Sequence, residues 1–287
     1  MRHFTDADVD RVLARAPIEE TLRRAFVALA EGRAAQQPRL RTEAGGVKLS
    51  TLGGVIPELG VVGAKVYTTL AGRFNFLIAL FSTATGEPIA TFEANAITKW
   101  RTAAVSRLAA SAAARPDPRA IAVFGTGVQG RSHAEAFSRA YPEARLRIVD
   151  RRMSTEDVSH ALDGADIVVT CTRSATPLFD GARVERGAFV AAVGSSRPDT
   201  RELDDALLGR AARVIVEWRE QALQEAGDLL LAPAELRNRL HVVDLGDVLA
   251  GKSPGRQSAD EIVLFKSVGV GIEDVAVAGL ACELLSK

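Results

Sequence analysis

The spacing of apolar residues changes along the chain and predicts elements of several kinds. Thr5 is a candidate cap for a short first helix, and a second helix follows at the apolar positions Ile18, Leu22, Phe26 and Leu29. Four short runs rich in β-branched and aromatic residues then predict a mostly β unit, at 47–55, 61–70, 76–83 and 88–94. Residues 97–114 predict an alanine-rich helix that Thr98 caps and that the prolines of 115–119 end.

From residue 120 onwards the pattern becomes an alternation of strands and helices. The predicted strands lie at 120–124, 146–150, 165–172, 187–194 and 212–217. Predicted helices lie at 133–141 and 205–211, and two later apolar runs, 241–249 and 261–268, precede a last helix at 271–285. Such an alternation is typical of an α/β domain with a parallel sheet.

Composition narrows the classes of function that this chain could serve. Its 287 residues, 47% apolar, suffice for one large or two moderate domains with a sizeable core. The 36 basic and 36 acidic residues cancel, so we expect no binding to nucleic acid or to an anionic membrane. Two distant cysteines and four scattered histidines predict no disulfide and no metal site. The N-terminus lacks the apolar run of a signal peptide, and no stretch approaches the ~20 apolar residues of a membrane span, so we expect a soluble cytoplasmic protein.

A glycine-rich loop carries the first chemical signal. Gly125, Gly127 and Gly130 form G-x-G-x-x-G, and the loop also contains Thr126, Val128 and Gln129. It follows a predicted strand and precedes a predicted helix, which is the context in which such glycines bind a dinucleotide pyrophosphate at a helix N-terminus. Asp150 ends the next strand, where a carboxylate accepts a hydrogen bond from the adenosine ribose. Asp150 favours NAD slightly because it repels a 2′-phosphate, whereas Arg151 and Arg152 could pair with the phosphate of NADP.

Seven segments together resemble the ornithine cyclodeaminase/mu-crystallin family. They are VGAKVYTT (62–69), TGEPIA (85–90), ITKWRTAAVSRLAA (97–110), FGTGVQGRSHAEAF (124–137), ADIVVTCTRSATPLF (165–179), VGSSRPDTRELD (193–204) and SVGVGIEDVAVA (267–278). The resemblance implies an α/β fold with a Rossmann-type NAD(P)-binding domain at 105–264 and a smaller α+β domain at 1–104, completed by 265–287. It further implies that the smaller domain binds a small imino- or amino-acid substrate and forms a homodimer.

The resemblance also assigns roles to three cations. Lys65 matches a lysine that touches the substrate carboxylate near the reacting carbon, and with a lowered pKa it could pass a proton to nitrogen. Arg101 matches an arginine that serves substrate and cofactor; counted from Thr98 it would lie in the first helical turn, where a cation opposes the helix dipole. Arg41 matches the arginine that clamps the carboxylate, and Arg39 is a near-equal alternative.

Further residues are expected at the cofactor. They are Arg101, Thr102, Arg151, Thr172, Val193, Gly194 and Ser267, in addition to the glycine loop and Asp150. We expect Glu273 and Asp274 to cap or pack the last helix.

Two departures from the family pattern matter. Ser196 stands where cyclodeaminases carry a catalytic aspartate, with Asp199 beyond Pro198, and a serine hydroxyl is a poor substitute for an acidic group. We therefore expect a cyclic ketimine (pyrroline-2-carboxylate type) reductase in which Ser196 contacts substrate, with an ornithine cyclodeaminase or a non-catalytic mu-crystallin-like binding protein as alternatives.

The second departure is length: the 14 residues 151–164 leave no room for the helix and strand that usually follow Asp150. Either the strand is lost or a segment is absent.

Overall fold

The computed structural model describes residues 1–287 and divides into two compact units. Unit 1 comprises Met1–Val105 and Gly269–Lys287, and unit 2 comprises Ser106–Val268. The limits expected from the sequence are 104 and 265. One helix, α3 (Asn95–Ala113), carries the chain from the first unit into the second. None of the helices combines the length and the apolar character needed to cross a membrane.

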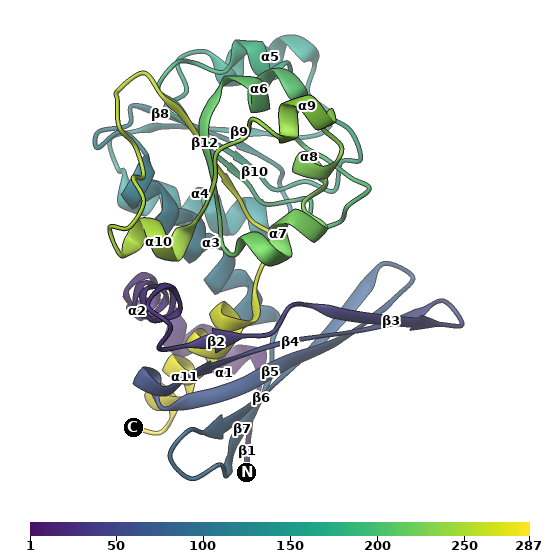
Figure 1. Ribbon diagram of the computed structural model, residues 1–287, viewed down its shortest axis with the longest axis vertical. Helices are drawn as coiled ribbons and strands as arrows, with labels where there is room; N and C mark the ends of the chain where they lie inside the picture. Colours follow the sequence, from purple (N-terminus) through teal and green to yellow (C-terminus); the bar gives the residue numbers. More distant parts are fainter. The chain divides into compact units, whose positions relative to one another are not determined.

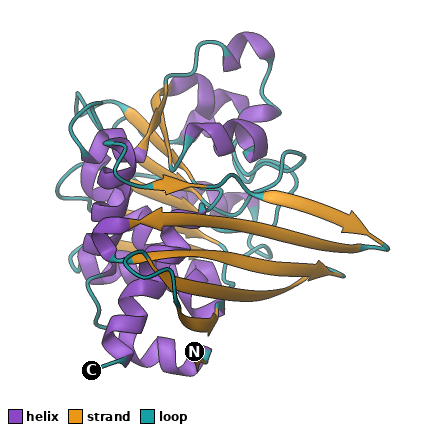
Figure 2. Ribbon diagram, turned by 60° about the horizontal axis from the view of Figure 1, so that its bottom comes forward, coloured by secondary structure: helices purple, strands orange, loops and turns teal.

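Unit 1 is built on a sheet of seven strands in the order β1-β7-β6-β5-β4-β2, with β3 also paired to β4. The strands are β1 (Arg2–Phe4), β2 (Ala35–Gln36), β3 (Leu40–Ala44), β4 (Val47–Ile56), β5 (Val61–Leu70), β6 (Arg73–Ser82) and β7 (Pro88–Glu93). The four predicted β runs correspond to β4–β7, and a short 3-10 turn, Pro57–Leu59, separates β4 from β5. The long strands β4–β6 are visible as the extended arrows of Figure 2.

Three further helices belong to unit 1: α1 (Asp6–Leu13), α2 (Ile18–Ala30) and α11 (Gly271–Leu285). Thr5 caps α1 in a capping box with Asp8, as predicted. Helix α11 packs on β4, β5 and β6 and against α1 and α2 (Figure 1). Its first residue must be glycine, because a Cβ on Gly271 would lie 2.5 Å from the backbone of Gly53 in β4. This close approach holds the N-terminus of α11 directly over the sheet.

Alternation along the strands gives the sheet two different faces. The face toward α11 carries buried side chains, among them Leu52, Lys65 and Ile78, which lie opposite one another on three neighbouring strands. The opposite face exposes large apolar side chains: Leu40, Val47, Leu49, Val55, Val66, Leu70, Leu77 and Phe81.

The start of α3 corrects one prediction. Thr98 is not its cap, because the helix begins at Asn95 and the Thr98 hydroxyl donates to the Ala94 carbonyl at 2.7 Å. The cap comes from elsewhere: the Asp6 carboxylate accepts from the Ala96 N–H at 2.7 Å and from the Asn95 side chain at 2.8 Å. Arg101 therefore lies in the second turn of α3 rather than in the first, and the dipole argument does not apply to it.

Unit 2 is a doubly wound domain around a parallel sheet with the order β13-β12-β14-β11-β10-β8-β9. The strands are β8 (Ala120–Phe124), β9 (Arg145–Val149), β10 (Ile167–Thr170), β11 (Phe189–Ala192), β12 (Ala211–Val216), β13 (Val242–Asp244) and β14 (Ile262–Lys266). The helices are α4 (Val128–Ala140), α5 (Thr155–Leu162), α6 (Asp205–Arg210), α7 (Arg219–Glu225), α8 (Gly227–Leu230), α9 (Ala234–Arg237) and α10 (Leu245–Leu249), with a 3-10 turn at Gly181–Arg183. The part β11-β10-β8-β9 follows the predicted Rossmann order without a strand beyond β9, and β14 lies between β11 and β12.

The connection after Asp150 holds one helix and no strand. Residues 151–164 hold the single helix α5, which leads from β9 back to β10 on the far side of β8. The strand that usually lies beyond β9 is therefore missing, and β9 is an edge of the sheet. Arg147 of β9 fastens the connection, because its guanidinium donates to three carbonyls at the end of α5, those of His160, Ala161 and Asp163.

Candidate active and cofactor sites

Lys65 lies in the middle of β5 and is only 3% exposed, so it is not an edge-strand lysine that faces water. Its ammonium donates to Asp274 Oδ1 at 3.0 Å and to Thr98 Oγ1 at 3.1 Å. The ring of Phe76 completes its surroundings, with its centroid 4.7 Å from the ammonium nitrogen. Burial lowers the pKa of Lys65 to about 8, although the charge of Asp274 opposes the shift. The amine and the ammonium are therefore both accessible near neutral pH.

Arg101 completes a buried cluster with the first turn of α11. Its Nη1 donates to Glu273 Oε2 at 2.7 Å, and its Nε lies 3.3 Å from Asp274 Oδ1. Gly269, with φ of +74°, makes room for the guanidinium, because a Cβ there would lie 2.8 Å from Nη2. The cluster brings two cations and two carboxylates together away from water.

The sequence predicts only a capping or packing role in the last helix for the two acidic residues of this cluster, Glu273 and Asp274. Both are fully buried and pair with Arg101 and Lys65. Burial alone would raise the pKa of Asp274, but the charges of Lys65 and Arg101 outweigh it and hold that pKa below its usual value. Its second oxygen, Oδ2, is buried without a hydrogen-bond partner. The available signal was a pair of acids inside an otherwise apolar helix.

Arg39 and Arg41 occupy different positions around this cluster. Arg39 is half-buried, donates to the Gly269 carbonyl at 2.6 Å and contributes positive charge at Lys65 and Asp274. Arg41 is exposed on β3, but the strand register places it opposite Ser50, which lies opposite Tyr67. Since Tyr67 is two residues from Lys65, Arg41 lies on the same face of the sheet as Lys65. Both arginines therefore remain candidates for the substrate carboxylate.

The glycine loop of unit 2 has the shape that a dinucleotide pyrophosphate needs. Gly125 has φ of +117°, and a Cβ on it would lie 2.7 Å from the Cys171 carbonyl. A Cβ on Gly130 would lie 2.0 Å from the Gly125 carbonyl, whereas Gly127 is exposed and has nothing within 4 Å of its Cβ position. No side chain caps the N-terminus of α4, so its dipole can face a phosphate. The residues present fit an NAD(P) cofactor.

Asp150 follows β9 and lies against this loop. Its carboxylate accepts from the Thr126 hydroxyl at 2.9 Å and from Nε of Arg152 at 2.7 Å. These hydrogen bonds, that to Arg152 first, lower the pKa of Asp150 to about 2, so the group is ionised. Arg151 and Arg152 are both exposed.

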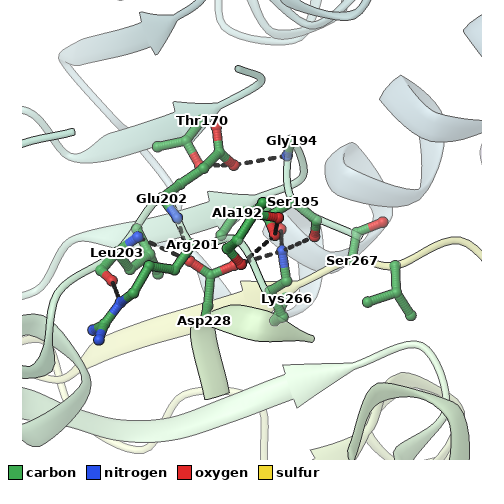
Figure 3. Close-up of polar contacts among 12 residues, drawn as sticks. Thr170, Ala192, Gly194, Ser195, Arg201, Glu202, Leu203, Asp228, Lys266 and Ser267 are labelled. Atoms are coloured by element: carbon green, nitrogen blue, oxygen red, sulfur yellow. Dashed lines mark hydrogen bonds and ion pairs between the residues drawn. The ribbon is translucent and has the colours of Figure 1, made fainter. Parts of the chain in front are cut away.

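The other expected cofactor residues of unit 2 lie in loops that follow strands of the sheet, and Figure 3 shows two of them, Gly194 and Ser267. Thr172 follows β10, Val193 and Gly194 follow β11, and Ser267 follows β14. Ser267 is buried and bonds Glu217 through its hydroxyl at 2.5 Å. The carboxyl ends of parallel strands are where α/β sheets bind their ligands.

Ser196 and Asp199 lie in the loop after β11. Ser196 is partly exposed, and Asp199 is exposed and accepts a hydrogen bond from Arg197 Nε at 2.8 Å. Thr102, expected at the cofactor, is buried in α3 and donates to the Thr98 carbonyl. In the described structure no group of three or more His, Cys, Asp or Glu side chains could hold a metal.

The chain resembles known proteins along its whole length. The sequence profile of the ornithine cyclodeaminase/mu-crystallin family matches residues 5–158 and 153–287. The mouse (Mus musculus) protein named ketimine reductase mu-crystallin is 35% identical over 225 residues, which cover 73% of this chain and 69% of the relative.

Two solved structures share the fold over essentially the whole chain. The probable ornithine cyclodeaminase from Bordetella pertussis is 48% identical with a TM-score of 0.91, and the match covers 100% of this chain and 97% of the other. The Thermococcus litoralis delta(1)-pyrroline-2-carboxylate reductase, in complex with NADH and L-proline, is 25% identical with a TM-score of 0.87, and the match covers 99% and 97%.

Proposed function

The chain belongs to the ornithine cyclodeaminase/mu-crystallin family, and from that membership we propose that it is an NAD(P)-dependent reductase of cyclic ketimine carboxylates of the pyrroline-2-carboxylate type. Such an enzyme acts on the C–N bond of a small imino acid. The single observation that carries the proposal is the buried Lys65–Asp274 pair beside Arg101. The names of the mouse and Thermococcus litoralis relatives support it.

The residues of unit 1 divide the chemistry on the substrate between them. Arg101, with Arg41 or Arg39, holds the carboxylate, because a guanidinium offers it a planar pair of donors. The Lys65 ammonium donates a proton to the imine nitrogen and becomes a neutral amine. Asp274 holds this lysine amine in place through their hydrogen bond. An NAD(P) cofactor held by the glycine loop and Asp150 would supply the hydride for the substrate carbon. Burial of the cluster keeps water away from the reacting carbon.

The residues of unit 2 favour NAD over NADP. The ionised Asp150 carboxylate can accept from the ribose hydroxyls and repels a 2′-phosphate. Arg152 already pairs with Asp150 at 2.7 Å, so its charge is engaged by that carboxylate.

A second copy of the chain is the partner that the unit 1 sheet fits. Eight large apolar side chains lie exposed on the sheet face away from α11. A contiguous apolar face of this kind marks a protein contact. A homodimer formed through this face would dissociate when Val66→Asp is introduced, whereas Leu223→Asp, at an exposed leucine of unit 2, would leave the mass in light scattering unchanged.

Ornithine cyclodeamination is a second candidate, favoured by the 48% identity to the Bordetella pertussis protein of that name. Against it, Ser196 replaces the acidic group and Asp199 is exposed and paired with Arg197.

The deciding experiment mixes the protein with pyrroline-2-carboxylate or piperideine-2-carboxylate and with NADH or NADPH in turn. Loss of the reduced-nicotinamide absorbance supports the reductase. Unchanged absorbance together with ammonia release from ornithine supports the cyclodeaminase, and cofactor binding without either reaction supports a binding protein.

A further inference from the structure

One buried carboxylate connects two of the loops that follow the strands of unit 2. Glu202 is fully buried and accepts four hydrogen bonds. Its Oε1 accepts from the N–H and the hydroxyl of Thr172, both at 2.7 Å, and its Oε2 accepts from the Gly194 N–H at 2.7 Å and the Thr170 hydroxyl at 2.8 Å. The two oxygens therefore hold two different loops, one after β10 and one after β11.

A second layer fixes Glu202 itself (Figure 3). The buried Asp228 accepts from the N–H groups of Glu202 and Leu203 at 2.6 and 2.8 Å. Lys266, at the end of β14, lies 2.9 Å from Asp228 and donates to the carbonyls of Ser195 and Ala192 at 2.6 and 3.2 Å. The carboxyl ends of three neighbouring strands, β10, β11 and β14, are thereby connected by one charged network.

The contact that this network enforces is very close. A Cβ on Gly194 would lie 2.1 Å from the Thr172 carbonyl and 2.5 Å from Glu202 Oε1. The loops after β10 and β11 are consequently locked to each other through glycine and carboxylate, with no flexible side chain between them. Thr172 and Gly194 are also two of the residues that the sequence analysis expects at the cofactor.

We propose that Glu202 is a positioning residue for the cofactor, and that it sets the affinity for the nicotinamide nucleotide by holding the backbone of Thr172 and Gly194. The proposal rests on the cofactor role proposed above. Asp228 and Lys266 support it by fixing the Glu202 backbone and the loop after β11. The chemistry predicts which variant is informative: a glutamine has one acceptor oxygen, so Glu202→Gln must turn an N–H₂ donor toward one of the two backbone N–H groups.

A matched control exists at the other end of the same sheet. Asp166 is also a buried carboxylate that accepts from two backbone N–H groups, those of Arg119 and Ala120, and it pairs with Arg115. It precedes β10, whereas Glu202 holds the residues that follow β10. Asp166→Asn therefore disturbs a similar network at the amino ends of the strands. The glycine loop lies at the opposite, carboxyl ends.

The experiment measures NADH and NADPH dissociation constants by nucleotide fluorescence for the wild type, Glu202→Gln, Thr170→Val and Asp166→Asn, with Tm alongside. We expect Glu202→Gln to weaken binding about tenfold, the size of one unsatisfied buried N–H, and to raise the KM for the nucleotide more than that for the imino acid. Thr170→Val, which removes a hydroxyl only, should weaken it less. Asp166→Asn should lower Tm without changing nucleotide affinity.

Each other result has a definite meaning. If Glu202→Gln lowers Tm as Asp166→Asn does but binds the nucleotide as tightly as the wild type, the positioning role is overturned. Wild type that binds the nucleotide but reduces no ketimine overturns the proposed substrate while leaving the Glu202 result to stand. Wild type that binds neither nucleotide overturns both.

Discussion

Two buried charged clusters, one in each unit, are constructed in different ways. In unit 1, Lys65 and Arg101 pair with the side chains of Glu273 and Asp274. In unit 2, Glu202 and Asp228 each accept from two backbone N–H groups, and Lys266 donates to two backbone carbonyls.

The difference indicates what each cluster is for. Side chains that bond other side chains can exchange partners and protons without moving the main chain, as a reaction site requires. Side chains that bond the backbone fix loops in place. Charge agrees with this division: with Arg39, the unit 1 cluster has three cations for two carboxylates and suits an anionic substrate, whereas Glu202 and Asp228 share one lysine.

The largest expected contrast comes from the two buried lysines. Lys65→Met should lower kcat/KM for ketimine reduction by about 10³-fold, because the proton donor is lost, with nucleotide affinity unchanged. Its stability cost should be smaller than that of Lys266→Met, because Asp274 keeps its ion pair with Arg101 and burial already disfavours the Lys65 charge. Lys266→Met should instead leave Asp228 uncompensated and lower stability by about 3–5 kcal/mol.

Calorimetry and steady-state kinetics on both variants test this contrast, with Lys48→Met as the control at an exposed lysine of the neighbouring strand. The assignment of catalysis to the unit 1 cluster would be wrong if Lys65→Met retained turnover. It would also be wrong if both variants lost stability and activity in parallel.

A second expectation concerns cofactor choice and affects unit 2 alone. Asp150→Asn removes the ionised carboxylate and releases Arg152, so the NADH-to-NADPH preference should move toward NADPH by about 30-fold. Glu156→Gln removes the same charge from exposed α5 and should change nothing. The measurement is the ratio of kcat/KM for the two nucleotides, and an unchanged ratio in Asp150→Asn would contradict the assignment.

A third expectation separates the two candidate arginines of unit 1. Arg41→Met should raise the KM for the imino acid about tenfold with kcat retained, since an exposed cation on the Lys65 face contributes to binding a carboxylate. Arg39→Met should also change the pH profile, because Arg39 lowers the pKa of Lys65. If Arg39→Met raised the KM for the imino acid and Arg41→Met did not, Arg39 would be the residue that binds the carboxylate.

Much of the fold could be predicted because its signals are local. The runs that became β4, β5 and β8 alternate or are wholly apolar and end at turn residues, and their boundaries are correct to within a residue. The strand β1 has three residues and forms by parallel pairing with β7, some 85 residues away, so no local pattern marks it. The short helices α7, α8 and α9 were missed for the same reason, and 241–249 proved to be a strand followed by a helix.

The site was predictable where a motif carried it and not where distant segments meet. The glycine loop and Asp150 have local spacing. The start of α3 depends on Asp6, some 90 positions away, and so the turn assigned to Arg101 was wrong. Glu273 and Asp274 gain their partners Arg101 and Lys65 only through the register of α11 on β4, which glycine contacts set and no periodicity reveals.

The smallest expected effect tests the proton directly. Lys65 must carry its proton to reduce an imine, so kcat/KM should fall as pH rises through about 8, the pKa of Lys65. The charged groups that face it are Asp274 on α11, Arg101 on α3 and Arg39; of these, the Asp274 charge raises the pKa of Lys65 and the two arginines lower it. Asp274→Asn should therefore move the falling limb to lower pH by about one unit. Because the substrate titrates identically with both proteins, only a limb that belongs to Lys65 can move. A limb that stays in place, or moves upward, would mean that another group supplies the proton.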